Sequence, residues 1–353
     1  MKYKIILILF LIVCFSCKKD IKKTEVEFTP RDIKEVEIGL LLQDSTLNVR
    51  ALEVNEGRVI AATSNGEIYR MILSHMDSFE KGNYFKYEED SLQVNNFRAS
   101  AFQGDYSYTL SIGSPAKLFK DGELVYQENH EKAFYDSMDF WNDKEGIAIG
   151  DPTDDCMSVI ITRDGGATWT KLPCDVLPKA KEGEAAFAAS DTNIAIVGDK
   201  TWVATGGKAS RVLFSPNKGK TWDVFETPII QGVETTGMYS IDFYDENNGF
   251  AIGGDYTKPE DNIANKIKTK DGGKTWDLVA QYQNPGYRSC VQYIPNRKGE
   301  ELVVVGFKGI DYSNDAGISW KHLSDEGFYT LRFVNDSVAY AAGSKRIAKL
   351  TFR

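Results

Sequence analysis

The sequence contains four copies of one eight-residue pattern, [Ser/Thr]-x-[Asp/Asn]-x-Gly-x-[Thr/Ser]-Trp. The copies occupy residues 162–169, 215–222, 269–276 and 313–320, and their tryptophans lie 53, 54 and 44 residues apart. A unit that recurs at an interval of a few tens of residues is typical of a propeller or another repeat array. No other feature constrains the fold of this chain as strongly.

Each copy predicts the tip of a β-hairpin. The Asp or Asn at the third position can accept backbone N–H groups within its own turn, and the Gly at the fifth position supplies a positive φ without steric strain. The hydroxyl groups tie the two ends of the turn together, and the Trp begins the outgoing strand and packs between sheets. We therefore expect four substantially buried tryptophans: Trp169, Trp222, Trp276 and Trp320.

A second signature precedes each copy and consists of an apolar strand, a polar turn and a strand that ends in small residues. It occupies residues 138–150, 187–198, 241–254, 291–306 and 331–343, with fainter copies at 52–64 and 101–114. Alternation of apolar and polar residues supports strands in every copy. The last unit stops after three strands, and residues 34–42 can supply its fourth. The sequence therefore predicts an all-β protein, a single seven-bladed β-propeller over residues 31–353, closed by an N-terminal strand so that no sheet edge stays open.

The first residues predict export and lipid anchoring. Lysines at positions 2 and 4 precede an apolar run from Ile5 to Phe15, which is too short to span a bilayer and is typical of a signal peptide. The run ends at Ser16-Cys17, which resembles a bacterial lipobox. We expect a signal peptide at residues 1–16, lipidation of Cys17 and a flexible tether at residues 17–30. By resemblance to Gram-negative lipoproteins, the residues after Cys17 favour the outer membrane of the cell envelope. An ordinary signal peptide that is cut elsewhere is the alternative, and the membrane leaflet stays open.

Composition excludes several classes of function. The net charge of −9 and the lack of a basic stripe argue against nucleic acid as a partner. The three histidines, His75, His130 and His322, are far apart in sequence, which argues against a His-based zinc site or a Ser-His-Asp triad. No Gly-x-Gly-x-x-Gly motif is present, and the single Cys-x-x-Cys spacing, Cys14 to Cys17, lies at the end of the predicted signal peptide, so we expect no cofactor. Calcium in an acidic loop (Asp151, Asp154, Asp155) is a weak candidate.

Two cysteines flank the first repeat turn. Cys156 and Cys174 would face each other across one hairpin, with Ile161 opposite Trp169. In an oxidising compartment they form either a disulfide or two buried thiols, and both alternatives are open. Cys290 has no evident partner and is expected in the core.

The repeats resemble the Asp-box (BNR) repeat of sialidases and other β-propellers. The phrase Gly-x-Ala-x-Gly at residues 249–253, followed by the copy at 269–276, is similar to propellers related to photosystem II assembly factors. This resemblance implies a scaffold that binds other macromolecules without catalysing a reaction.

Aligning the units brings seven side chains to the starts of the innermost strands, around one axis: Arg50, Arg98, Asp136, Glu184, Tyr239, Arg288 and Tyr329. Desolvated arginines in such a ring favour a carboxylate or phosphate ligand. The alternative is a structural ring of ion pairs that closes the channel.

Loops between the second and third strands open on the same face, and three of them are long and polar: 150–156, 198–211 and 253–265. Binding residues concentrate on such loops. The candidates to rim a pocket are Asp151, Trp202, Arg211, Asp255 and Tyr256.

Two functions follow. The first is a monomeric, lipid-anchored binding or assembly module, whose partner is an envelope protein or an acidic glycan. The second is a sialidase-like glycoside hydrolase, in which Glu184 polarises Tyr239 as nucleophile and Asp151 acts as acid and base. The Arg-Ile-Pro motif expected near the N-terminus of a sialidase is absent, and the first function is preferred.

Overall fold

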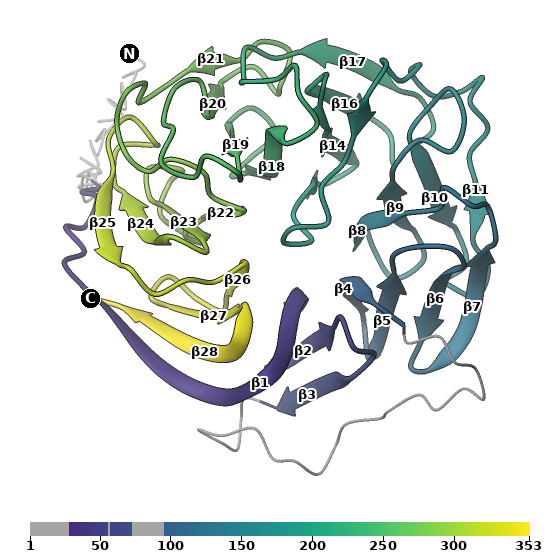
Figure 1. Ribbon diagram of the computed structural model, residues 1–353, viewed down its shortest axis with the longest axis horizontal. Helices are drawn as coiled ribbons and strands as arrows, with labels where there is room; N and C mark the ends of the chain where they lie inside the picture. The colour runs from purple at the N-terminus through teal and green to yellow at the C-terminus, as the bar shows by residue number, and fades with distance from the viewer. Residues whose placement is uncertain (1–27, 56, 73–94) are drawn as a thin grey trace, which may run out of the picture.

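The computed structural model describes residues 28–55, 57–72 and 95–353. In this part of the chain all regular structure is β-strand, arranged radially around a central axis (Figure 1). None of the described residues forms a helix long and apolar enough to cross a membrane. The predicted signal peptide, the lipidation site at Cys17 and most of the predicted tether lie outside the described residues.

The described strands pair into six antiparallel sheets. Four sheets have four strands each. They are β4 (Phe97–Gln103), β5 (Tyr106–Ser111), β6 (Ala116–Lys120) and β7 (Glu123–Glu128); β8 (Tyr135–Phe140), β9 (Gly146–Gly150), β10 (Ser158–Thr162) and β11 (Thr170–Lys171); β13 (Ile194–Val197), β14 (Lys200–Ala204), β16 (Arg211–Ser215) and β17 (Asp223–Glu226); β22 (Cys290–Tyr293), β23 (Leu302–Gly306), β24 (Gly309–Ser313) and β25 (Lys321–Ser324).

Two sheets have six strands. One contains β12 (Glu184–Ala185), β15 (Gly206–Gly207), β18 (Thr236–Phe243), β19 (Gly249–Asp255), β20 (Lys266–Thr269) and β21 (Asp277–Leu278). The other contains β26 (Thr330–Phe333), β27 (Val338–Ala342), β28 (Ser344–Phe352), β1 (Val36–Asn55), β2 (Arg58–Thr63) and β3 (Ile68–Ile72). The all-β propeller is as predicted, but the strand pairing gives six sheets where seven were expected.

The long strand β1 explains both the closure of the ring and the lower count of sheets. Its first part pairs with β28, from Val36 opposite Phe352 to Asn48 opposite Ser344. Its second part pairs with β2, from Val49 opposite Thr63 to Asn55 opposite Arg58. The N-terminal strand therefore joins the C-terminal strands, as residues 34–42 predict, and it also continues without a break into the next group of strands (Figure 1).

The residues before β1 fasten this closure. The Arg31 guanidinium binds the Glu301 carboxylate, with 2.7 Å between Nη2 and Oε2, and the Glu301 side chain is fully buried. Arg31 also donates to the Asp336 carbonyl oxygen at 2.7 Å. Removing one partner of a buried ion pair is strongly destabilising. Arg31 therefore fixes the segment before β1 to two neighbouring sheets.

The four repeat turns share one hydrogen-bonding scheme. In the copy at 269–276, the Gly273 N–H donates to Thr269 Oγ1 at 3.0 Å, and the Thr275 N–H and hydroxyl donate to Asp271 at 2.9 and 2.7 Å. The indole N–H of Trp276 closes the turn on the Gly273 carbonyl at 2.9 Å. The backbone contacts recur in the other copies. Two details differ: Trp169 Nε1 has no acceptor among the described residues, and in the copy at 215–222 the Asn217 amide donates to the Thr221 hydroxyl at 2.9 Å.

The burial of the four tryptophans is only partly as predicted. Trp169 and Trp276 are 7% exposed, whereas Trp222 and Trp320 are half-buried and pack against the edge of a core cluster.

The fifth-position glycine has a second role that its φ alone does not reveal. A Cβ on Gly273 would lie 2.9 Å from the Trp202 indole, and one on Gly317 would lie 2.1 Å from the Phe250 ring. Each repeat turn therefore lies against a large side chain of the preceding sheet. The fourth position also has a positive φ, even where it is Lys218 (58°) or Ala316 (57°). The repeat turns thus shape the hairpins and also bind neighbouring sheets together.

The first repeat hairpin differs by one residue from the expected register. Ile161 lies opposite Thr170, not opposite Trp169. Cys156 and Cys174 form a disulfide with an S–S distance of 2.01 Å, and Cys290 is a buried free thiol.

The fourth unit departs most from prediction. Residues 187–198 were expected to form strand, turn and strand, but only Ile194–Val197 is a strand, β13. The second strand, β14, lies at Lys200–Ala204, inside the segment predicted as a long loop. The inner strand is short because residues 186–193 leave the sheet and enter the centre of the ring, as described next.

Candidate functional site

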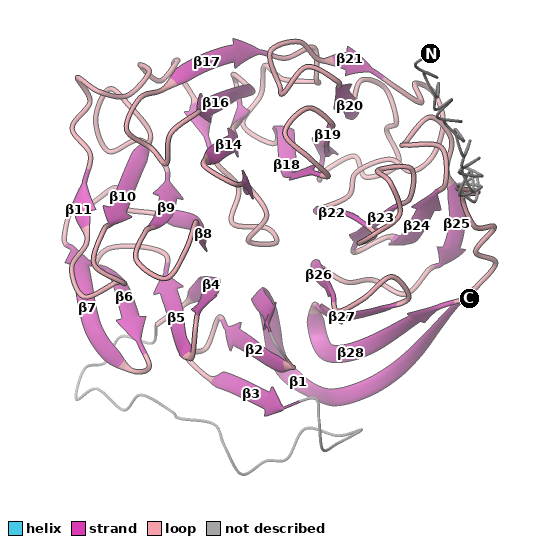
Figure 2. Cartoon of the chain, turned by 180° about the vertical axis from the view of Figure 1, so that it is seen from behind, coloured by secondary structure: helices cyan, strands magenta, loops and turns pink. Residues whose placement is uncertain are grey.

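The propeller has two faces, which we name by their connections. On the loop face the inner strands β4, β8, β18, β22 and β26 begin, and on the turn face lie the repeat turns. In Figure 2, which shows the ring from behind, the inner strands surround the centre. Because one face collects the starts of all inner strands, the side chains at those positions converge on the mouth of the central channel.

Residues 186–193, the channel segment, cross this centre and bind several inner strands. Ser190 Oγ donates to the Ser289 carbonyl oxygen at 2.6 Å, and Thr330 Oγ1 donates to the Ser190 carbonyl oxygen at 2.8 Å. The Asp191 carboxylate accepts the N–H groups of Ser100 at 2.7 Å and Met138 at 3.1 Å. The channel is therefore filled by the chain itself, and a ligand can approach only its mouth.

Arg50 and Arg98 lie over the channel segment on the loop face. Arg50 Nη1 donates to the Ala189 carbonyl oxygen at 3.1 Å, and Arg98 Nη1 donates to the Ala188 carbonyl oxygen at 3.2 Å. Arg50 also stacks on the Tyr329 ring, with 3.9 Å from its guanidinium carbon to the ring centroid. The segment that fills the channel thus forms the floor on which the two guanidinium groups rest.

The two arginines are not neutralised. Among the ion pairs between described residues, none includes Arg50 or Arg98, and Arg50 Nε is buried without an acceptor. Burial, and then the charge of Arg50, lower the pKa of Arg98 to about 10, while Asp136 and Tyr329 oppose this shift. Two like charges held close together in a partly desolvated place are unfavourable by themselves and favour an anionic ligand.

Asp136 and Asp151 lie next to the channel segment, Asp136 near Arg98 and Asp151 at Ala186. Asp136 is fully buried, and its carboxyl group lies near the Ala188 backbone and Arg98 but makes no hydrogen bond of standard geometry. Burial and the neighbouring Asp151 raise the pKa of Asp136 well above its ordinary value. Asp151 Oδ1 accepts the Ala186 N–H at 2.8 Å, and burial raises the pKa of Asp151 to about 6. Asp151 therefore holds the start of the channel segment and does not rim an open pocket alone.

Arg288 does not join the other two arginines, contrary to the predicted ring. Its Nε and Nη2 bind Asp311 Oδ2 at 2.8 and 2.7 Å, and both side chains are buried. Asp311 also binds His322 Nδ1 at 2.9 Å. Arg288 and Asp311 line a separate cavity of about 300 Å³ together with His322 and Lys308. Because Asp311 is not one of the seven ring residues, Arg288 belongs neither to an open arginine ring nor to a ring of ion pairs among those residues.

Glu184, Arg211 and Trp202 are internal and do not face the channel mouth. Glu184 binds Arg211 through two contacts, Nε to Oε1 at 3.0 Å and Nη2 to Oε2 at 2.5 Å, and both side chains are buried. Trp202 is fully buried on β14, stacks on Phe243 with 3.7 Å between centroids, and donates to the Gly272 carbonyl oxygen at 2.8 Å. The register shift in the fourth unit explains these three errors.

Tyr239, Asp255 and Tyr256 lie on the loop face, but Tyr239 does not meet Glu184. The Tyr239 hydroxyl donates to the Thr235 carbonyl oxygen at 2.9 Å, and burial raises the Tyr239 pKa. Glu184 accepts from Arg211 and from Thr205 Oγ1 at 2.7 Å. Asp255 accepts from Thr257 at 2.7 Å, and Tyr256 is exposed. Tyr239 and Glu184 therefore do not form the tyrosine–carboxylate pair that the hydrolase hypothesis assigned to them.

The acidic loop proposed for calcium lines a polar cavity of about 430 Å³, to which Asp151, Asp154 and Asp155 contribute. Across the described part of the chain, no group of three or more His, Cys, Asp or Glu side chains is arranged to hold a metal ion.

The fold is similar to that of solved β-propellers. The structure described as YCF48 bound to D1 peptide has a TM-score of 0.62 and 12% identity, and the match covers 92% of this chain and 97% of that chain. U3-55K gives a TM-score of 0.62 and 12% identity, over 91% of this chain and 100% of that chain. YCF48 from Cyanidioschyzon merolae gives 0.61 and 11%, over 90% and 98%. No protein-family model and no curated protein matches the sequence.

At such low identity these similarities establish the β-propeller fold alone. The resemblance to Asp-box repeats and to sialidases stays a hypothesis.

Aligning the repeat units of this sequence with one another did not predict that residues 186–193 enter the central channel. Its contacts join residues that are 99 and 140 positions apart, such as Ser190 with Ser289 and with Thr330. The run Ser190-Asp191-Thr192 is the only signal, because three short polar residues in a row do not suit the interior of a strand.

Proposed function

We propose that this protein is a non-catalytic binding propeller, which holds an acidic group of a partner at the channel mouth on its loop face. The single observation that carries the proposal is the pair Arg50 and Arg98, adjacent and partly desolvated, with no carboxylate partner among the described residues. An acidic protein that leaves two adjacent arginines unpaired gives up stability there, and such exceptions concentrate at functional sites.

We also propose that the ring has seven blades. The sheet that contains β1 is better described as two blades, because β1 pairs with β28 along its first part and with β2 along its second, with a register break between Gln43 and Asn48. With β1 divided there, each of the seven units read from the sequence has its own set of strands. The four repeat turns are then Asp-box repeats that join the third and fourth strands of four blades.

The anchoring part of the proposal rests on the sequence of residues 1–30. Lipidation of Cys17 would tie the propeller to the outer membrane of the cell envelope as a monomer. The test is a Cys17→Ala variant, which should move from the membrane fraction to the soluble fraction after processing. A variant that stays wholly with membranes through its N-terminus would show that Cys17 is not the anchor.

No observation favours the hydrolase. The groups that it needs are engaged elsewhere, Tyr239 with Thr235 and Glu184 with Arg211. We expect no turnover of a fluorogenic sialoside by the full chain, and turnover that disappears in Tyr239→Phe would overturn the non-catalytic proposal.

The binding proposal is tested with random-sequence peptides that are displayed and selected on the full chain in detergent. Enriched peptides should contain Asp or Glu, and Arg50→Met should abolish their enrichment. Lys298→Ala, an exposed cation of the turn face, is the matched control and should enrich the same peptides. Enrichment that is indifferent to acidic residues and to Arg50 would refute the site.

A further inference from the structure

Five aromatic rings extend from the channel mouth across the loop face, and we call them the aromatic ladder: Phe187, Tyr239, Tyr256, Tyr287 and Phe307. Phe187, in the channel segment, stacks on Tyr239 with 3.9 Å between centroids and nearly parallel planes. Tyr239 meets Tyr287 edge-on at 4.8 Å, and Tyr287 meets Phe307 at 5.4 Å. Tyr256 stands edge-on to both Tyr239 and Tyr287, at 6.5 Å from each.

Two rings of the aromatic ladder are buried, and two are largely exposed to solvent. Tyr239 and Tyr287 are only 3% and 4% exposed, whereas Tyr256 is 48% and Phe307 is 40% exposed. Both exposed rings contact the Tyr287 ring, so each is held in place by a buried neighbour. Rigid, half-exposed aromatic side chains of this kind provide contact area at low entropic cost, and they are enriched where proteins bind one another.

The ladder is continuous with the arginine pair. Ala189 packs in one apolar cluster with Phe187, Tyr239 and Tyr287, and its carbonyl oxygen accepts the hydrogen bond from Arg50. Arg50 also stacks on the Tyr329 ring, and its charge opposes the rise that burial causes in the pKa of Tyr287. The unpaired cations and the apolar rings therefore belong to one surface, in which a charged contact and an apolar contact lie side by side.

Two polar groups along the ladder, the Tyr239 hydroxyl and the Asp255 carboxylate, are already engaged within the protein. The Tyr239 hydroxyl binds the Thr235 carbonyl oxygen, and the Asp255 carboxylate binds the Thr257 N–H and hydroxyl at 3.0 and 2.7 Å. A sugar needs many free donors and acceptors around its ring, whereas an apolar side chain needs none. The surface therefore suits a peptide better than a glycan.

We propose that the aromatic ladder and the arginine pair together bind a peptide segment of a partner protein that carries an acidic side chain close in sequence to a large apolar one. The acidic group pairs with Arg50 and Arg98, and the apolar side chain packs on Tyr287 against Tyr256 and Phe307. This inference rests on the proposed function and adds to it the apolar half of the recognition motif.

The experiment uses the peptides enriched from the random library on the full chain. They should share Phe, Leu, Ile, Met or Trp within a few residues of Asp or Glu. In a titration of one labelled enriched peptide, Tyr256→Ala and Phe307→Ala should each weaken binding by about tenfold, as expected for an aromatic anchor. Tyr106→Ala is the matched control, because Tyr106 is also 48% exposed but belongs to the turn face, at the start of β5.

A second peptide, with its apolar residue replaced by alanine, completes a double-mutant cycle. It should bind weakly to the wild-type chain and should lose its sensitivity to Tyr256→Ala, because the two changes remove the same contact. Thermal unfolding of each variant verifies that the fold is intact.

The outcomes separate the two proposals. Peptides that depend on Arg50 but show no apolar preference and no effect of Tyr256→Ala would overturn the ladder and leave the proposed function standing. Binding of an acidic oligosaccharide that depends on Tyr256, with no enriched peptide, would overturn the peptide class. If no acidic probe binds and Arg50→Met changes nothing, both proposals fail.

Discussion

The turn face and the loop face are built from the same strands, but their charged side chains differ in the hydrogen-bond partners that they find within the protein. On the turn face, Asp164, Asp271 and Asp315 each accept hydrogen bonds from residues of their own turn. On the loop face, Arg50 and Arg98 donate to carbonyl oxygens of the channel segment, and Arg98 donates also to the Asn96 side-chain oxygen, but neither forms an ion pair with a described carboxylate. In the first arrangement each carboxylate is hydrogen-bonded within its own eight-residue turn, whereas in the second the two guanidinium groups have no ion-pair partner among the described residues.

The two ends of the central channel repeat this contrast. Near the turn face, Arg332 binds Glu53 with 2.9 Å between Nε and Oε2, and its Nη2 donates to the Asp191 carbonyl oxygen at 2.9 Å. Near the loop face, the arginine pair has no such carboxylate. The two ends also differ in burial, because Arg332 is 7% exposed whereas Arg50 and Arg98 are only partly buried. This contrast agrees with the proposed function, in which the loop face holds the acidic group of a partner.

The strongest test of this contrast removes a turn-face tryptophan. Trp276→Ala should lower the free energy of unfolding by about 3–5 kcal/mol, because it deletes a large buried aromatic side chain. Urea unfolding measures the effect, and Tyr256→Ala on the loop face is the control, with an expected loss under about 1 kcal/mol. Equal losses of unfolding free energy for the two variants would contradict the idea that the turn face contributes more to stability than the loop face.

The next test removes a loop-face arginine. Arg98→Met should weaken binding of an enriched acidic peptide by about 1.5–3 kcal/mol, the range for a hydrogen bond to a charged group. Its free energy of unfolding should stay the same or rise, because the repulsion between Arg98 and Arg50 disappears. A fluorescence titration and urea unfolding of the same sample give both quantities. A large loss of stability with unchanged binding would make Arg98 a structural residue.

The parts of the fold that could be predicted from sequence are those fixed by local chemistry. The repeat turns follow from hydroxyl, carboxylate and glycine at set positions within eight residues. The closure by the N-terminal strand followed from a count of strands, since a propeller unit with only three strands leaves an edge unpaired. Both conclusions needed no knowledge of distant contacts.

The site was predictable only where each unit kept its local register. Arg50 and Arg98 stand at inner-strand starts because β1 and β4 run in full, so alignment placed them together. Arg288 stands at the equivalent position, but the buried Asp311 draws its side chain away from the axis. Glu184 was misplaced because the channel segment displaces most of an inner strand, and its contacts come from the opposite side of the ring. Pairwise side-chain geometry and long-range contacts are not encoded in the spacing of a repeat.

A smaller effect should appear in the pH dependence of stability. Burial, and then Glu53, raise the pKa of Asp139 to about 7, and burial raises the pKa of Asp242 to about 6. A carboxyl group with a raised pKa holds its proton more tightly in the folded protein than in the unfolded chain. The contribution of such a group to the free energy of unfolding is therefore fully present below about pH 4 and is lost as the pH rises to about 7.

Asp139→Asn should remove the Asp139 share of this dependence and stabilise the protein at pH 8 by an amount on the order of 1–2 kcal/mol. Urea unfolding at pH 5 and pH 8 measures the difference between the two proteins. Parallel curves for wild type and variant would show that Asp139 has an ordinary pKa in the folded state.

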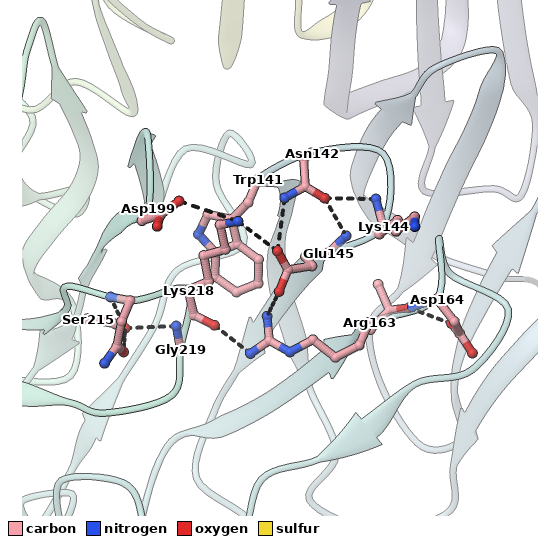
Figure 3. Close-up of polar contacts among 12 residues, drawn as sticks. Trp141, Asn142, Lys144, Glu145, Arg163, Asp164, Asp199, Ser215, Lys218 and Gly219 are labelled. Atoms are coloured by element: carbon pink, nitrogen blue, oxygen red, sulfur yellow. Dashed lines mark hydrogen bonds and ion pairs between the residues drawn. The ribbon is translucent and has the colours of Figure 1, made fainter.

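The smallest effect is expected at a turn-face ion network between two sheets. Figure 3 shows Glu145 between Lys218 and Arg163, at 2.7 and 2.9 Å, with Trp141 beside them. The hydrogen bond from Lys218, then that from Asn142, lowers the pKa of Glu145 to about 2. The contribution of this carboxylate is therefore present above about pH 4.5 and is lost as the pH falls toward 2.

Because these side chains are in contact with water, solvent screens their attraction. Glu145→Gln should lower the midpoint of thermal unfolding at pH 7 by much less than Trp276→Ala does, and salt should reduce the difference further. A differential scanning measurement at low and high salt checks both points. A loss as large as that of Trp276→Ala would mean that ion pairs, and not the buried side chains beneath the repeat turns, hold the sheets together on this face.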